Sequence, residues 1–516
     1  MRAIDFQRRR TSIVNIGHIA IGGDNPIAVQ SMTNTPTLHT QASAAQCLSI
    51  AHAGADIVRL TAQTSKHAAN LAPIRQAVRD AGCDIPLVAD IHFNPEAAFT
   101  AAEIVEKVRI NPGNFVDPGR TFKKLEFTDE EYAAEIERIR QKLVPLLQIC
   151  RKHHTALRIG VNHGSLSDRI MSRYGDPPAG MVESAMEFLR ICVAENFNDV
   201  VISIKASNVV VMTSTVRLLV DAMTKENMAF PLHLGVTEAG DGEDARVKSA
   251  VGIGSLLADG IGDTIRVSLS EDPENEIPVA QQLLAHIDTR RHNPLGSDAE
   301  AEVVTTSCGV PQVIGLDCQQ APLHSTHITV GHPNVIGRAR AAIAHAPKDK
   351  PLSVSVLYPS NMTDEQVTIA AAVDLGALLL ERADICAIEI DAPQIPLERR
   401  NALALSILQA TRRRMSKTEY IACPSCGRTL FDLQTTLAQV KAATASQPSL
   451  KIGVMGCIVN GPGEMADADY GYVGAGPGRV SIYRGKECVI KNIPTDEALP
   501  RMIELIKADG RWCDEA

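Results

Sequence analysis

The sequence predicts an α/β protein whose largest part is a TIM (β/α)8 barrel, followed by an inserted α/β domain and a small C-terminal α/β module. Short β-branched runs alternate with longer helical stretches eight times between residues 26 and 270, which is the size and rhythm of such a barrel. A doubly wound open sheet is the alternative, but it rarely carries eight such even repeats. Hydrophobic residues make up 45% and aromatic residues only 3%, a composition typical of aliphatic α/β layers.

Each expected strand opens one βα unit. The expected strands are PIAVQSM (26–32), ADIVRLT (55–61), PLVADIHF (86–93), EKVRINPGN (106–114), ALRIGVNHG (156–164), DVVISIKAS (199–207), PLHLGVTEAG (231–240) and DTIRVSLS (263–270). The polar linker RRHNPLGSDAE, residues 290–300, then ends the rhythm. We therefore expect a barrel domain over residues 1–290, a middle domain with a structural role over 291–416, and a C-terminal domain over 417–516.

The overall charge and the cysteine pattern exclude several classes of protein. The 51 basic residues are outnumbered by 60 acidic ones, which argues against a general nucleic-acid binder. No apolar run approaches a membrane span, and the basic N-terminus lacks a following apolar segment, so we expect no signal peptide and a cytoplasmic chain. The twelve cysteines are mostly single, which indicates reduced thiols rather than a disulfide framework.

Polar side chains gather at the C-terminal ends of the expected strands. A single such residue would more often be a structural salt-bridge partner, but seven of the eight strands share the pattern. Four arginines and a lysine in one barrel mouth would repel each other unless a polyanion joined them, so we expect a small diphosphate or bisphosphate ligand. The strand-end residues are Arg59, Asp90, His92, Arg109, Asn111, Arg158, Asn162, Lys205, Glu238, Arg266 and Ser268.

A second constellation lies between Cys423 and Glu464. The motif CPSCGR supplies Cys423 and Cys426, and the Gly-rich loop GCIVNGPGE supplies Cys457 and Glu464. Three soft thiolates and one exchangeable oxygen suit an iron-sulfur cluster with one open iron. A structural zinc remains the alternative, although a zinc ribbon needs a second CxxC. In a metal-free protein Glu464 would be a surface carboxylate.

The chain resembles the 4-hydroxy-3-methylbut-2-enyl diphosphate synthase family of the methylerythritol phosphate route to isoprenoids. The resemblance covers about residues 11–270 and 418–516, and the middle segment looks like the inserted domain of the long family form. It implies a two-electron reductive ring opening of 2-C-methyl-D-erythritol 2,4-cyclodiphosphate, with loss of one hydroxyl as water. The motifs that carry it, in chain order, are VQSMTNT, VADIHF, RINPGN, RIGVN, SIKAS, LGVTEAG, IRVSLS, CPSCGR and GCIVNGPGE.

The resemblance also implies roles for individual residues. It implies one 4Fe-4S cluster held by Cys423, Cys426, Cys457 and Glu464, and single electrons from a ferredoxin or flavodoxin. Glu238 would lie at the reacting carbon as proton donor, and both Glu238 and Glu464 count as catalytic. It implies that Arg59, Arg109, Arg158, Lys205, Arg266 and Ser268 hold the diphosphate, with Asn162 nearby. The strand-end pattern adds Asp90, His92 and Asn111 to the expected substrate-binding residues.

Two other functions remain open from the sequence. The first is a transferase of the dihydropteroate-synthase type, whose barrel would carry a structural zinc module and no redox centre. The second is a non-enzymatic iron-sulfur sensor, which would leave the cationic barrel mouth unexplained. For the synthase, the inserted domain favours an active site completed within one chain, and the short family form leaves a homodimer open.

Overall fold

The computed structural model describes residues 2–118, 125–175, 178–447, 450–458, 463 and 467–513. The chain divides by its internal contacts into two units. Unit 1 consists of the N-terminus up to Arg9 and of residues 242–262 and 279–417, and unit 2 of residues 10–241, 263–278 and 418–516. The three domains expected at 1–290, 291–416 and 417–516 remain a prediction.

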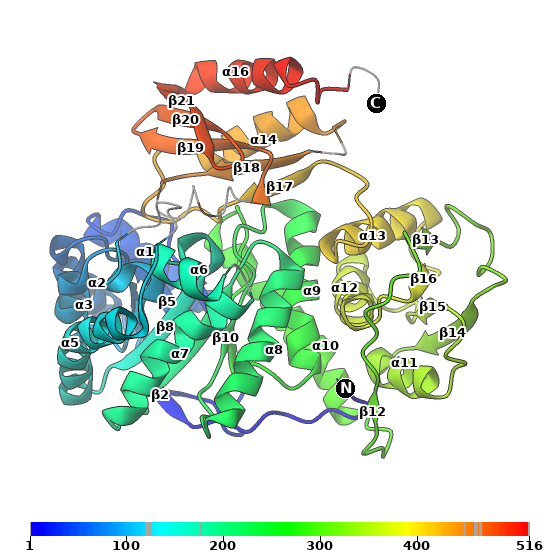
Figure 1. Cartoon of the computed structure of the whole chain (residues 1–516), viewed down its shortest axis with the longest axis horizontal. Coiled ribbons are helices and arrows are strands. Elements are labelled where there is room, and N and C mark those ends of the chain that lie inside the picture. The colour runs from blue at the N-terminus through cyan, green and yellow to red at the C-terminus, as the bar shows by residue number, and fades with distance from the viewer. Residues whose placement is uncertain are drawn as a thin grey trace. The chain divides into compact units, whose positions relative to one another are not determined.

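Unit 2 contains the predicted barrel (Figure 1). Its eight strands are all parallel, and a bridge between Ile202 and Leu232 joins the last strand of the sheet back to the first. Every expected run holds one strand, so the barrel is confirmed and the open sheet was the wrong alternative. In spatial order the strands are β10 (His233–Leu234), β11 (Thr264–Ile265), β4 (Ala28–Met32), β5 (Ile57–Thr61), β6 (Leu87–Asp90), β7 (Lys107–Ile110), β8 (Ala156–Asn162) and β9 (Val200–Lys205).

Helices connect these strands, and several begin with a side-chain cap. Thr128 and Glu131 form a capping box at the start of the longest, α5, which satisfies backbone N–H groups that the first turn leaves free. The helices are α1 (Thr40–His52), α2 (Ser65–Asp80), α3 (Pro95–Ala102), α4 (Pro112–Phe115), α5 (Asp129–His153), α6 (Asp168–Tyr174), α7 (Ala179–Ala194) and α8 (Val209–Lys225), with 3-10 turns η1 (His163–Ser165) and η2 (Pro273–Asn275).

A short hairpin closes the N-terminal end of the barrel, and the sequence analysis did not anticipate it. Its strands are β2 (Val14–Ile16) and β3 (Ile19–Ile21). The hairpin forms a hydrophobic cluster with side chains near the starts of barrel strands, which leaves the opposite, carboxyl end for ligands. The cluster comprises Val14, Ile16, Ile21, Ala28, Ile57, Val88, Ala156 and Val201.

The C-terminal part of unit 2 is a five-stranded sheet. Its first three strands are parallel and the last two antiparallel, and helices α14 (Leu433–Thr444) and α16 (Thr495–Ala508) share one hydrophobic cluster with it. Because β17 and β18 are parallel neighbours, the loops that follow them leave the same edge of the sheet. The strands are β17 (Glu419–Ala422), β18 (Lys451–Met455), β19 (Tyr470–Gly476), β20 (Arg479–Arg484) and β21 (Glu487–Pro494).

Unit 1 holds a four-stranded parallel sheet, as expected for an α/β middle segment. Its helices α9 and α12 approach so closely that a Cβ at Gly254 would lie 2.5 Å from the Val373 side chain. In spatial order the sheet is β13 (Gln312–Val313), β16 (Ile385–Asp391), β15 (Leu352–Leu357) and β14 (Thr326–Gly331); β1 (Arg2–Ala3) pairs with β12 (Glu300–Ala301). The helices are α9 (Gly242–Ala258), α11 (Val335–Ala344), α12 (Asp364–Glu381) and α13 (Leu397–Ala410), and α10 (Glu276–His292) begins in unit 2. No helix among the described residues is long and apolar enough to cross a membrane.

Candidate active site

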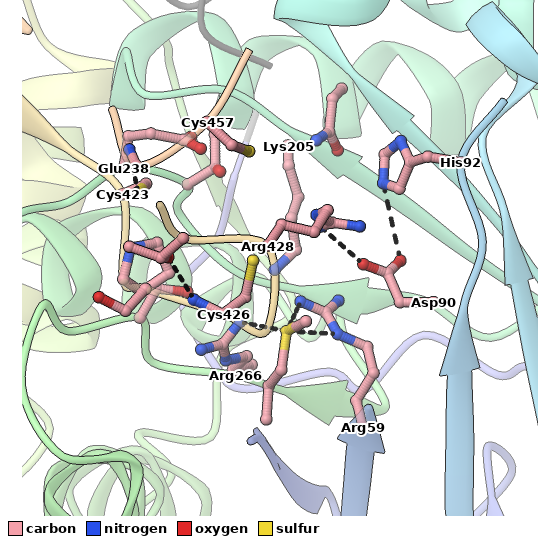
Figure 2. Close-up of a pocket in the computed structure, with 18 of the residues that line it drawn as sticks. Arg59, Asp90, His92, Lys205, Glu238, Arg266, Cys423, Cys426, Arg428 and Cys457 are labelled. Carbon is pink, nitrogen blue, oxygen red and sulfur yellow. Dashed lines mark hydrogen bonds and ion pairs between the residues drawn. The ribbon is translucent and has the colours of Figure 1, made fainter. Parts of the chain in front are cut away.

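A cavity lies within unit 2 where the carboxyl ends of the barrel strands meet the loops after β17 and β18 (Figure 2). Most of the predicted site residues line it, although their sequence positions span almost four hundred residues. The predicted residues in its lining are Arg59, Asp90, His92, Arg109, Arg158, Asn162, Lys205, Glu238, Arg266, Ser268, Cys423, Cys426 and Cys457. The roles assigned to them remain predictions.

Two predicted residues are not part of the described lining. Asn111 lies beside the cavity, where its side chain caps α4 through the Gly113 N–H at 3.1 Å and donates to Ser165 Oγ at 2.6 Å. Its amide is therefore occupied in holding a loop at the barrel mouth. Glu464 lies outside the described residues.

One wall of the cavity is organised around Asp90. Arg109 donates to Asp90 Oδ1 at 2.8 Å, and a second guanidinium, that of Arg428, donates to Oδ2 at 3.2 Å. Burial alone would raise the pKa of Asp90, but Arg109 and Arg59 hold it well below its usual range. Burial, together with Arg109, lowers the pKa of His92 well below its usual range. Asp90 is thus a carboxylate among cations, and His92 is neutral.

A second part of the cavity wall holds Arg59 and Arg266 around the sulfur of Met32. Arg59 Nε and Nη2 lie 3.0 and 2.7 Å from this sulfur, and Arg266 Nη1 lies 3.5 Å from it. Arg266 is fixed by a bidentate pair with Glu276, at 3.0 and 2.8 Å. Burial lowers the pKa of Arg59 to about 10, since thioether sulfur offsets little of the lost hydration. Arg59 therefore lacks a strong anionic partner of its own.

Arg158 is deeply buried, with an exposed fraction of 1%. Its Nε and Nη1 have no hydrogen-bond partner among the described residues. Burial and the neighbouring Arg59 lower the pKa of Arg158 well below its usual range. A buried charged donor left without a partner is costly, by about 1–3 kcal/mol or more. Such orphaned donors in a cationic cavity indicate an anionic ligand.

Lys205 provides a test of this anion site. Burial and the guanidinium of Arg59 lower the pKa of Lys205 well below its usual range. A bound diphosphate would raise that pKa again, so binding above the lowered pKa takes up a proton. We therefore expect the affinity for a diphosphate to fall as pH rises through that pKa.

Titration calorimetry in buffers of different ionisation enthalpy measures the proton uptake directly. The uptake should shrink in Lys205→Met. An unchanged proton count in this variant would contradict the assignment.

Glu238 is held in a strained backbone conformation at the cavity edge. Its φ of 49° lies in the left-handed region, which non-glycine residues rarely adopt. Its side chain is buried, and within the described part of the chain its Oε2 has no hydrogen-bond partner. Burial raises the pKa of Glu238, while Thr237 and Lys205 oppose that effect. These are properties of a group that holds a proton next to a reacting atom.

Cys423, Cys426 and Cys457 come together because β17 and β18 end at the same edge of the sheet. The backbone N–H of Gly456 donates to Cys423 Sγ at 3.3 Å, and that of Cys426 donates to Thr429 Oγ1 at 3.1 Å. Hydrogen bonds to cysteine sulfur are among the features by which proteins tune iron-sulfur clusters. The donor set and its backbone contacts fit such a cluster.

The described residues contain no group of three or more His, Cys, Asp or Glu side chains that could hold a single metal ion. A zinc site needs its ligands around one ion, whereas each cysteine of an iron-sulfur cluster binds a different iron.

Several residues of the lining were not predicted from the sequence. Arg428 enters from the C-terminal sheet, Met32 from the end of β4, and Thr237 from the residue before Glu238. Arg428 could have been noticed, because it follows Cys426 by two positions within CPSCGR. Met32 could not have been predicted, since an apolar residue at a strand end is normally expected to lie in the hydrophobic core.

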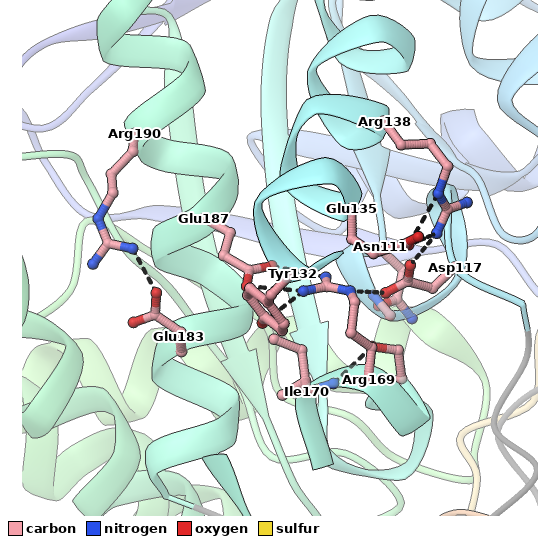
Figure 3. Close-up of polar contacts among 12 residues, drawn as sticks. Asn111, Asp117, Tyr132, Glu135, Arg138, Arg169, Ile170, Glu183, Glu187 and Arg190 are labelled. Carbon is pink, nitrogen blue, oxygen red and sulfur yellow. Dashed lines mark hydrogen bonds and ion pairs between the residues drawn. The ribbon is translucent and has the colours of Figure 1, made fainter. Parts of the chain in front are cut away.

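Behind the barrel mouth, a buried ion network holds the loop that contains Asn111 (Figure 3). Arg169 pairs with Asp117 at 3.1 Å and with Glu187 at 2.8 Å, and it donates to Tyr132 Oη at 2.6 Å. The network joins α5, α6 and α7 to the segment after β7. It therefore positions the mouth without lining the cavity.

This network gives a stability prediction. Arg169→Met leaves Glu187 and Asp117 as buried carboxylates without their main partner, so we expect a loss of about 3–5 kcal/mol in the free energy of unfolding. Arg190→Met is the control, because Arg190 pairs with Glu183 and Glu226 at the surface and should cost about 1 kcal/mol or less. Urea unfolding measures both losses. Equal losses would show that the buried network contributes no more to the free energy of unfolding than the ion pairs at the surface.

Comparison with known families decides the identity of the fold. The GcpE TIM-barrel domain matches residues 11–281, and the GcpE protein C-terminal domain matches residues 419–508. The chain belongs to the GcpE family. The two matched segments contain every cavity residue described above.

GcpE relatives match along nearly the whole chain. A Bacteroides fragilis protein is 49% identical, with 99% of this chain and 97% of the relative covered. A Phocaeicola vulgatus protein is also 49% identical with both chains fully covered, and an Akkermansia muciniphila protein is 41% identical with 99% and 98% covered. All three are named 4-hydroxy-3-methylbut-2-en-1-yl diphosphate synthase (flavodoxin). The Bacteroides alignment spans 611 positions, so it contains gaps in this chain of 516 residues.

Membership of the GcpE family confirms the family predicted from the motifs, the barrel fold and the prediction of an enzyme. It supports the synthase over the transferase with a zinc module. A solved N-acetylneuraminic acid synthetase from Leptospira borgpetersenii shares 13% identity, over 57% of this chain and 93% of that chain, with a TM-score of 0.37. That likeness is too weak to bear on function.

Proposed function

We propose that this chain reduces 2-C-methyl-D-erythritol 2,4-cyclodiphosphate to 4-hydroxy-3-methylbut-2-en-1-yl diphosphate, with single electrons from flavodoxin or ferredoxin. The names of the relatives supply the product and flavodoxin. One observation carries the proposal: a single cavity contains the barrel cations, Glu238 and three cysteines. A polyanion site, a proton donor and soft metal ligands together match a reduction of a diphosphate.

The cations bind and orient the diphosphate. Arg158 offers two buried donors without a partner among the described residues. Arg59 adds positive charge nearby, and Lys205 adds more when it takes up a proton on anion binding. Arginine forks match phosphate oxygens in a bidentate manner. The substrate and the product both carry a diphosphate, so the same side chains hold the molecule through the reaction. The buried lining also excludes bulk water from the reacting carbons.

Glu238 supplies the proton that the departing hydroxyl needs. The conversion consumes two electrons and two protons per substrate; the ring carbon-oxygen bond to phosphate breaks, and one hydroxyl leaves as water. The raised pKa of Glu238, caused by burial, keeps a proton on a carboxyl that has no partner at Oε2 in the described structure. Asp90, in contrast, stays ionised between Arg109 and Arg428. Two carboxyl groups in one cavity thus take different roles.

Cys423, Cys426 and Cys457 would hold the cluster, with Glu464 as the fourth ligand. A bound 4Fe-4S cluster would supply single electrons and a Lewis-acidic iron. The chain's own contribution is the Gly456 N–H group on Cys423 Sγ and the hydrogen bond from the Cys426 N–H to Thr429 Oγ1, which fixes the loop after β17.

Anaerobic turnover tests the proposal. The purified holoenzyme is incubated with the cyclodiphosphate and a low-potential reductant, and the product is identified by mass spectrometry. We expect a diphosphate with one oxygen atom fewer than the substrate, and we expect flavodoxin or ferredoxin to replace the chemical reductant. Absence of this product from brown, iron-loaded enzyme would reject the proposed function.

A further inference from the structure

Arg428 is fixed in the cavity by the way its segment meets the barrel. The backbone N–H of Gly240 donates to the Ala422 carbonyl at 3.2 Å, and Ser270 Oγ donates to the Cys423 carbonyl at 2.7 Å. A Cβ at Gly427 would lie 2.7 Å from the Thr35 carbonyl oxygen, so the backbone there lies directly against the barrel mouth. The residue that follows is projected into the cavity.

The guanidinium of Arg428 is buried but only partly bonded. Its side chain has an exposed fraction of 9%, and Nη2 donates to Asp90 Oδ2 at 3.2 Å. Its Nε and Nη1 are buried, and no described residue accepts a hydrogen bond from them. Figure 2 shows Arg428 beside Asp90, among the labelled cysteines and cations of the lining. Within the described part of the chain, these two donors therefore face the cavity.

The charges of the cavity do not balance. Asp90 and Glu238 are the only carboxylates among the described lining residues, and the raised pKa of Glu238 favours its neutral form. Cys423, Cys426 and Cys457 add negative charge as thiolates, but together with Asp90 they are still fewer than the cationic side chains. Asp90 already accepts from Arg109. The cations of the lining are Arg59, Arg109, Arg158, Lys205, Arg266 and Arg428. Asp90 accepts one hydrogen bond from each of Arg109 and Arg428, but its single negative charge does not neutralise both guanidiniums.

We propose that Arg428 binds the diphosphate of the substrate from the C-terminal sheet and so makes the bound anion part of the contact between this sheet and the barrel. The inference rests on the proposed function, since it takes the diphosphate as the ligand. Asp90 holds Arg428 in position, and the anion accepts from Nε and Nη1. Substrate then strengthens the seating of the cysteine loop on the barrel, so that electrons arrive when substrate is in place.

Binding and hydrogen exchange together test Arg428. The iron-loaded enzyme is titrated anaerobically with the cyclodiphosphate, without reductant, as wild type and as Arg428→Gln, Arg428→Lys and Arg501→Gln. Arg501 is the matched control, because it pairs with Glu504 at 3.2 Å on the exposed face of α16. We expect Arg428→Gln to weaken binding about ten- to a hundredfold, Arg428→Lys to weaken it less, and Arg501→Gln to leave it unchanged.

The exchange experiment separates binding from seating. In the wild type, the cyclodiphosphate should slow amide exchange in residues 423–429 as well as at the barrel strand ends. In Arg428→Gln, only the barrel ends should be slowed. If Arg428→Gln loses its iron, Arg428→Lys carries the same two measurements. The inference would be overturned if the Arg428 variant that retains its iron bound the cyclodiphosphate with wild-type affinity and showed wild-type protection of residues 423–429.

The same data distinguish failure of this inference from failure of the proposed function. If the wild-type enzyme does not bind the cyclodiphosphate at all, the proposed function fails and Arg428 loses its ligand. A second outcome is that the wild type binds the cyclodiphosphate, that Arg158→Gln abolishes binding and that Arg428→Gln leaves binding unchanged. In that case only the role of Arg428 is wrong.

Discussion

Glu238→Gln is expected to lower kcat by about a hundred- to ten-thousandfold, the range for loss of a general acid. Glutamine has the shape of the protonated carboxyl group but cannot release a proton to the departing hydroxyl. The diphosphate contacts of Arg158 and Lys205 remain, so the dissociation constant of the cyclodiphosphate should change little. Single-turnover kinetics and titration calorimetry measure the two quantities separately.

The control for Glu238 is a carboxylate outside the cavity. Glu226 pairs with Arg190 at the end of α8, and Glu226→Gln should leave kcat unchanged. If Glu238→Gln retained the wild-type kcat, the proton would come from another group. If it lost substrate binding and kcat together, Glu238 would act in binding.

Cys457→Ser should abolish turnover and remove most of the bound iron. A serine oxygen is a harder ligand than a thiolate and holds iron of a cluster poorly. The measurements are iron content, visible absorption under anaerobic conditions and turnover with a low-potential reductant. Far-ultraviolet circular dichroism establishes that the five-stranded sheet still folds.

Cys488→Ser is the matched control for Cys457. Cys488 is a partly buried cysteine of the same sheet, on β21, where its Sγ lies 3.8 Å from the Ile490 carbonyl oxygen. It does not belong to the described cavity lining, so its loss should leave iron and turnover in place. Full iron content in Cys457→Ser, or equal loss in both variants, would refute Cys457 as a ligand.

The sequence by itself determined the barrel, because the signal is local and repeated. Each βα unit places an apolar β-branched run before a helical stretch, and all eight runs became strands. It also determined most of the cavity, since the carboxyl ends of barrel strands converge whatever the detailed packing. Arg59 and Arg158 could be assigned to the cavity from their places in the strand runs, although both lie inside their strands and not at the ends.

At some strand ends the local turn decided whether a side chain enters the cavity. Asn111 follows a strand, as Asn162 ends one, yet Asn111 caps α4 while Asn162 accepts from Arg109 at 3.3 Å in the cavity. The Asn-Pro pair at 111–112 is a helix-start signal that competes with the strand-end pattern. The sequence therefore predicted that both asparagines lie near the barrel mouth, but it did not predict which of them contacts the cavity.

Only the tertiary structure decided which residues of the C-terminal sheet enter the barrel mouth. Arg428 and Asp90 form an ion pair although 338 positions separate them. Their meeting depends on the parallel pairing of β17 with β18 and on the contacts of Ala422 and Cys423 with the barrel loops. Local periodicity gives the direction of a side chain within its own strand or helix, but it carries no information about the register between sheets that lie far apart in the chain.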